Sequence, residues 1–335
     1  MRNDFGTTLI RVGLRIESLA LAVLVVSLAL TSNSTAQQES AQDAKPIICS
    51  LGSDLVVLTA TVENATGHPV TNLSHNDFLV FDNGEPQRID FFTREDQARS
   101  IGIVFDRSTS VSTGDPKWFG ALCQSLVRLK DQSNPENEYF LIGADHSPKL
   151  ITDWTRDSDA LIEGLSRLAF IRTKGGSAVY DACLLARQKM NEHISPAIIL
   201  LISDGQDGAS QSSCRDLQMS LKKPDVLLYS LCPANAKGSL ALSGRDNLKK
   251  LSAASGGAAY FLSSSTAATD AVARIGAQLR HQYLIGYYPS DVRRDGRWHS
   301  VIVTANSAND PSRETSLVVR TRPGYYALNE LRALR

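Results

Sequence analysis

Short, continuous apolar runs alternate with amphipathic helical stretches between Ser100 and His281, and this alternation limits the possible folds more than any other feature. Such runs are typical of parallel strands that are buried on both faces of a sheet. The predicted strands are residues 101–106, 138–144, 197–203, 225–231 and 258–262. The predicted helices are residues 116–130, 157–169, 178–192, 212–222, 244–255 and 266–280, with Asp157, Ser243 and Ser264 or Ser265 as starts. This order predicts an α/β fold with a doubly wound, mainly parallel, Rossmann-like sheet.

Both flanks of this region have the pattern of antiparallel strands. Residues 46–95 contain the β-rich run 55–62 and the turn Asp82-Asn83-Gly84, which is a strong hairpin signal. Strand character returns in residues 282–328. Because neither flank has enough strands to bury a sheet face alone, we expect the two to pair. The sequence therefore predicts one small antiparallel β-sandwich, into which the α/β domain of residues 96–281 is inserted.

The first residues have the layout of a secretory signal. Three arginines precede the apolar run Leu19–Leu30, which is shorter than the ~20 residues of a membrane-spanning helix. Ser34 and Ala36 are the small residues that a signal peptidase requires. We expect a signal peptide over residues 1–36, a flexible leader over 37–45, and a periplasmic or secreted protein with no membrane insertion after cleavage. An uncleaved amino-terminal anchor is the alternative, because Glu17 lowers the charge of the leading segment.

Charge and cysteine content exclude two classes of function. The chain has 35 Lys and Arg against 35 Asp and Glu, so no field of one sign attracts nucleic acid. The five cysteines are widely spaced without a C-x-x-C pair, and no two histidines are four residues apart, which argues against a zinc site. Cys214 and Cys232 are the predicted disulfide, since both should lie at the same edge of the sheet.

Oxygen-donating side chains follow two of the predicted strands. The first strand ends in Asp106-Arg107-Ser108-Thr109-Ser110, and the strand at 197–203 ends in Asp204-Gly205. Open α/β sheets place their ligands at the carboxyl ends of strands, and Gly175-Gly176-Ser177 can bring a third hydroxyl there. Hard cations prefer such oxygen ligands. The sequence therefore predicts one Mg²⁺ or Mn²⁺ ion, bound by Asp106, Ser108, Ser110, Ser177 and Asp204, with an open position for an external carboxylate.

These motifs resemble the von Willebrand factor type A domain and its metal-ion-dependent adhesion site. The resemblance covers roughly residues 100–280; Ser177 stands where the family usually has threonine, and Thr109 where it usually has glycine. The runs Leu284–Tyr287 and Arg322–Tyr326 are similar to the arms of an exported von Willebrand A family found in acidobacteria. The resemblance implies a protein-binding module whose partner offers an Asp or Glu carboxylate.

Enzyme activity is not predicted. A phosphatase of the Asp-x-Asp type would need an aspartate where Ser108 stands, and no nucleophile elbow, dinucleotide-binding or P-loop motif occurs. A hydrolase stays a remote alternative, and two hypotheses come before it. One is a metal-dependent adhesion or scaffolding module; the other is a structural envelope protein that binds through its β-sandwich and has a weak or vestigial metal site. Partner choice is expected to lie in loops 145–156 and 205–214.

Overall fold

The computed structural model describes residues 54–94, 96–108, 111, 116–170, 176–193, 196–223, 226–233, 239–292, 294–306 and 317–328. All of these belong to the second of two compact units, Ile48–Arg335. The expected signal peptide (1–36) and leader (37–45) lie outside the described residues. Within the described part of the chain, no helix combines the length and the apolarity that crossing a membrane requires.

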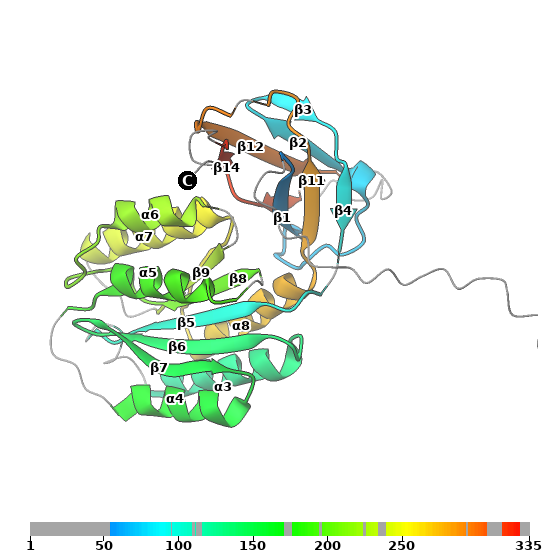
Figure 1. The fold of residues 1–335 in the computed structure, drawn as a ribbon. Coiled ribbons are helices and arrows are strands. Elements are labelled where there is room, and N and C mark those ends of the chain that lie inside the picture. Colours follow the sequence, from blue (N-terminus) through cyan, green and yellow to red (C-terminus); the bar gives the residue numbers. More distant parts are fainter. Residues whose placement is uncertain are drawn as a thin grey trace, which may run out of the picture. The chain divides into compact units, whose positions relative to one another are not determined.

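A six-stranded sheet forms the centre of the α/β domain (Figure 1), in the order β10-β9-β8-β5-β6-β7. All neighbouring pairs are parallel except β6 and β7. The strands are β5 (Ser100–Asp106), β6 (Glu138–Ala144), β7 (Pro148–Thr155), β8 (Ala197–Ile202), β9 (Val226–Cys232) and β10 (Ala259–Phe261). The five predicted strands are confirmed to within one or two residues. Most of the predicted loop 145–156 is instead the antiparallel edge strand β7.

In the described part of the chain, these helices cover the two faces of the sheet: α3 (Pro116–Gln132), α4 (Ser158–Phe170), α5 (Val179–Met190), α6 (Cys214–Leu221), α7 (Ser239–Ser255) and α8 (Ser265–Arg280). Helices α3, α4 and α8 pack on one face and α5, α6 and α7 on the other (Figure 1), each with its own hydrophobic cluster. Ser264 caps α8 by accepting from the Ala267 amide at 3.1 Å, as predicted. The predicted start of α7 at Ser243 is wrong, because the helix-forming residues 240–242 extend it to Ser239.

The two flanks of the chain combine in two four-stranded antiparallel sheets, ordered β13-β1-β11-β4 and β14-β12-β2-β3. Their strands are β1 (Val56–Glu63), β2 (Phe78–Asp82), β3 (Glu85–Gln87), β4 (Phe91–Thr93), β11 (Tyr283–Tyr287), β12 (Trp298–Ala305), β13 (Val318–Arg320) and β14 (Gly324–Tyr326), with a short 3-10 helix at His75–Asp77. Amino-terminal β1 pairs with carboxyl-terminal β11, and β2 pairs with β12. The predicted fold class is thereby confirmed, whereas the exact domain limits stay predictions.

Turn chemistry and a buried carboxylate organise the sandwich. Asn83 and Gly84 both have positive φ angles, 51° and 88°, which gives the two-residue hairpin between β2 and β3 that the sequence predicts.

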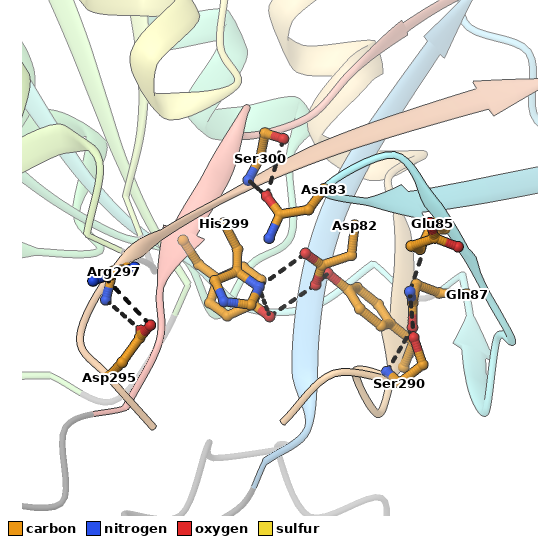
Figure 2. Close-up of polar contacts among 11 residues, drawn as sticks. Asp82, Asn83, Glu85, Gln87, Ser290, Asp295, Arg297, His299 and Ser300 are labelled. Carbon is orange, nitrogen blue, oxygen red and sulfur yellow. Dashed lines mark hydrogen bonds and ion pairs between the residues drawn. The ribbon is translucent and has the colours of Figure 1, made fainter. Parts of the chain in front are cut away.

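Asp82, only 5% exposed, accepts hydrogen bonds from the hydroxyls of Tyr287 (2.9 Å) and Tyr325 (2.8 Å). Its other oxygen lies 3.0 Å from the Nδ1 atom of His299 (Figure 2). One carboxylate therefore links strands of both sheets.

The cysteines correct one prediction. Cys214 and Cys232 are free thiols, as are the other cysteines that the structure describes. Cys232 donates a weak hydrogen bond to the carbonyl oxygen of Pro233 at 3.7 Å, whereas Cys214 contacts Tyr180. Because the two sulfur atoms have different neighbours, the predicted Cys214–Cys232 disulfide is wrong.

Candidate metal centre

Two buried aspartates lie at the carboxyl ends of adjacent parallel strands. Asp106 is the last residue of β5, and Asp204 follows β8 after one residue. The two strands pair in register up to Phe105 and Ile202, so both carboxylates come to the same edge of the sheet. Asp106 is 0% exposed and Asp204 1% exposed. This is the edge where α/β sheets bind ligands.

Neutral hydrogen-bond donors surround Asp106. The Ser108 amide donates to its Oδ1 atom at 2.8 Å, and the Ser203 hydroxyl donates to its Oδ2 atom at 2.6 Å. Burial raises the pKa of Asp106 to about 6, and the donors Ser203, Ser108 and Ser177 partly offset that rise. Ser177 is thus close to the carboxylate. Its buried Oγ nevertheless has no hydrogen-bond partner of ordinary geometry among the described residues.

Glycines allow the segments of the site to approach one another. Gly205 has a φ of +80°, which side-chain-bearing residues rarely adopt, and a Cβ atom there would lie 2.2 Å from the carbonyl oxygen of Gly244 in α7. A Cβ on Gly176 would lie 3.0 Å from the Cα atom of Gly208. The turn after Asp204 therefore lies directly against α7, and the backbone before Ser177 lies against the loop that follows Asp204.

The loop between β8 and α6 is fixed to the start of α5. Asp207 accepts a hydrogen bond from the Tyr180 amide at 2.9 Å. Asp181 in turn accepts from the amides of Gln211 (2.8 Å) and Ser212 (3.0 Å). Asp207 therefore caps the first turn of α5. The predicted partner-selecting loop 205–214 is therefore held in place by its own aspartate and by one from α5.

Four of the five predicted ligands fall within the described residues: Asp106, Ser108, Ser177 and Asp204. Ser110 lies outside them. Ser203, which sequence reasoning did not single out, is the closest partner of Asp106. The available signal was its position at the end of a buried apolar run, since a buried hydroxyl needs a hydrogen-bond partner.

The chemistry of these groups fits a hard cation. Neither Asp106 nor Asp204 makes an ion pair with a residue that the structure describes, although buried carboxylates normally pair with cations or bind metals. The buried Ser177 hydroxyl lies beside Asp106 and adds a further oxygen. In the described part of the chain, no group of three or more His, Cys, Asp or Glu could hold a metal. The predicted site does not need one, because three of its five donors are serine hydroxyls.

Comparison with known proteins agrees with this architecture. Residues 101–206 match the model of the von Willebrand factor type A domain. The chain contains a von Willebrand A domain. The match begins within β5 and ends just after Asp204, so it includes all five predicted ligands. A search of curated proteins finds no match to this chain.

Solved structures also resemble the chain. A von Willebrand factor type A protein from Catenulispora acidiphila is 10% identical with a TM-score of 0.48, over 84% of this chain and 75% of that one. The conserved hypothetical protein BatB from Bacteroides thetaiotaomicron is 14% identical with a TM-score of 0.43, over 54% and 98%. The mussel byssus proximal thread matrix protein 1, with a zinc-occupied MIDAS motif, is 14% identical with a TM-score of 0.46, over 59% and 49%.

Proposed function

We propose that this chain is an exported adhesion or scaffolding module. In this proposal, Asp106, Ser108, Ser110, Ser177 and Asp204 hold one Mg²⁺ or Mn²⁺ ion, and the ion takes an Asp or Glu carboxylate of a protein partner. Domains of the von Willebrand A family commonly act as protein-interaction modules. The export step rests on the signal expected in residues 1–36.

The observation that supports the metal site most strongly is the environment of Asp106. This carboxylate is fully buried and receives only neutral donors from the described residues. A buried carboxylate without a cation is costly, and a divalent ion would remove that cost. Ser203 and the Ser108 amide hold the carboxylate in place, which leaves the Ser177 hydroxyl available as a further ligand.

The donor set also favours a carboxylate partner. Serine hydroxyls bind a cation without neutralising it. If the two aspartates act through bound water, the divalent ion stays under-neutralised at its open position and attracts a further anion. When bound, such an ion supplies electrostatic attraction for a partner's carboxylate. The chain's own residues fix where that carboxylate arrives, since the loop after Asp204 is hydrogen-bonded to the start of α5.

We infer that the site is not an active site. Among the described residues, no histidine forms a hydrogen bond with Asp106 or Ser177, whereas hydrolysis requires a paired nucleophile and base. His299 is buried in the sandwich beside Asp82, and His193 packs against Trp154. Binding is therefore the function that this arrangement supports best.

Titration calorimetry with Mg²⁺ and Mn²⁺ tests the metal site. Wild-type protein should bind one ion, and Asp106→Ala and Asp204→Ala should each weaken binding at least about tenfold, because each removes a charged ligand. Asp153→Ala is the matched control, since Asp153 of β7 is an exposed carboxylate that forms an ion pair with Lys189 of α5. Circular dichroism should verify that all variants are folded. Equal metal binding by all four proteins would contradict the proposal.

Partner capture distinguishes the two functional hypotheses. Immobilised wild-type chain should retain its envelope partner in Mg²⁺ and release it when a chelator is added, and Asp106→Ala should fail to retain it in either condition. If the same partner stays bound in chelator and to Asp106→Ala, the β-sandwich is the binding surface. That result would favour the structural envelope protein and reject metal-dependent adhesion.

A further inference from the structure

A pocket of about 540 Å³ lies between helices α3 and α4 of the von Willebrand A domain. Apolar side chains form most of its lining: Phe119 and Val127 from α3, and Ile162 and Leu165 from α4. Its volume is within the range of sites that bind small molecules, which are commonly ~300–1,000 Å³ and mostly apolar. None of the predicted metal ligands lines this pocket, so its function is separate from the metal site.

The walls of the pocket are anchored in the domain core. Leu165 is 2% exposed and belongs to the cluster that fills this face of the sheet. The Phe119 ring packs edge-on against Phe105 of β5, with ring centroids 5.3 Å apart. At the opening, Ile162 is 43% exposed. The pocket is therefore a preformed recess with an apolar rim, and filling it would remove Ile162 from water.

Arg128 is the one charged residue among the described residues that line the pocket. Arg128 is exposed and lines the pocket, and it makes no ion pair with any described residue. None of the lining residues is acidic. Burial raises the pKa of the Cys123 thiol to about 12, so this thiol is uncharged at neutral pH and adds to the apolar lining. A guanidinium at the edge of an apolar recess is complementary to an anion with an apolar body.

We propose that the α3–α4 pocket binds a small amphiphilic carboxylate, with its hydrocarbon chain between Phe119, Val127 and Ile162 and its carboxylate at Arg128. The ligand class is a free carboxylate of medium chain length. A helix of a protein partner is the alternative occupant of this rim, and a failure of small carboxylates to bind there would favour it.

Calorimetric titration with decanoate, below its micelle concentration, tests this site. We expect one saturable site in the wild-type chain and about fivefold weaker binding of the neutral decanol, since an exposed ion pair contributes modestly. Arg128→Glu should remove the preference for decanoate over decanol. Ile162→Glu should weaken both ligands at least about tenfold. Ser166→Trp, a substitution of an exposed residue of the lining, should block the recess in a folded chain.

Matched substitutions elsewhere complete the test. Arg215→Glu changes an exposed arginine of α6, and Ile302→Glu changes a 59% exposed isoleucine of β12; both should leave decanoate binding unchanged. Absence of saturable decanoate binding to the wild type would overturn the proposal. So would binding that Ile162→Glu and Ser166→Trp leave intact, or that the two control substitutions weaken to the same extent. These results do not depend on whether the metal site binds an ion.

Discussion

The Asp82 carboxylate accepts hydrogen bonds from side chains of both sheets of the sandwich. Tyr287, which is 0% exposed, and Tyr325 both donate to it, and His299 lies beside it. Burial and the neighbouring carboxylate raise the pKa of both tyrosines, so both phenols remain protonated and can donate. Because a buried donor without an acceptor is costly, this single side chain stabilises the contact between the two sheets.

Asp82→Ala should therefore lower the free energy of unfolding by about 3 kcal/mol, since it leaves the Tyr287 hydroxyl buried without its acceptor. Asp295→Ala is the control, because Asp295 is exposed in the same sandwich (Figure 2) and should change stability by less than about 0.5 kcal/mol. Urea denaturation followed by circular dichroism measures both. Coincident unfolding curves for the two variants would show that the Asp82 hydrogen bonds contribute nothing net.

At the metal centre, the sequence predicts those site residues that directly follow a buried strand. Asp106 and Asp204 each follow a long apolar run, and runs of this kind become parallel strands whose ends meet. Ser203 was missed because a serine next to an aspartate is a common turn residue, and only the pairing of β5 with β8 brings its hydroxyl to Asp106. The prediction of the disulfide was wrong for a related reason. The order of the strands places Cys214 and Cys232 in one region, but it does not determine the directions in which their side chains point.

Between elements, helix α7 lies against the turn after β8 without room for a side chain at Gly244. A Cβ on Gly244 would lie 2.3 Å from the carbonyl oxygen of Asp204. Real Cβ atoms do not approach so closely, so any larger residue must displace α7 or the turn. By contrast, a Cβ on Gly120 of α3 would meet nothing within 4 Å. The structure therefore has no room for a side chain at Gly244, whereas it has room for one at Gly120.

Gly244→Ala should destabilise the domain by about 2 kcal/mol, because overpacking must be relieved by backbone movement. It should also weaken Mg²⁺ binding in calorimetry if Asp204 is a ligand. Gly120→Ala should stabilise by about 0.5–1 kcal/mol, since alanine favours the helix and meets no neighbour. Thermal unfolding of both variants gives the comparison. A stabilising Gly244→Ala would mean that the tight approach of α7 to the turn is absent in solution.

Periodicity predicts the buried elements well and the edge elements poorly. The five parallel strands are continuous apolar runs, whereas Pro148–Thr155 mixes proline, lysine and aspartate with apolar residues. This segment becomes strand β7 only because β6 offers a free edge, and its register is irregular. Helix α7 begins one turn early for a similar reason, since helix formers before Ser243 need no capping signal. The β7 strand therefore depends on pairing with β6, whereas the start of α7 follows from local helix propensity that a prediction based on capping residues overlooks.

Over the whole chain, the sandwich is built from segments more than two hundred residues apart. Leu58 of β1 pairs with Ile285 of β11, and Val80 of β2 pairs with Val303 of β12. All four side chains belong to one hydrophobic cluster. Because every sheet of the sandwich contains strands from both flanks, neither flank has a complete sheet without the other. The two flanks should therefore gain and lose structure together.

Ile285→Asp tests this cooperation. Ile285 is 0% exposed between β1 and β4, and a buried, unpaired charge there should cost more than about 4 kcal/mol. Hydrogen exchange should then show loss of protection in both Val56–Glu63 and Trp298–Ala305. Ile302→Asp makes the same change at an outward position of β12 and should leave both strands protected. If Ile285→Asp exposes the carboxyl-terminal strands while β1 and β2 keep their protection, the flanks fold independently and the sandwich is not one cooperative unit.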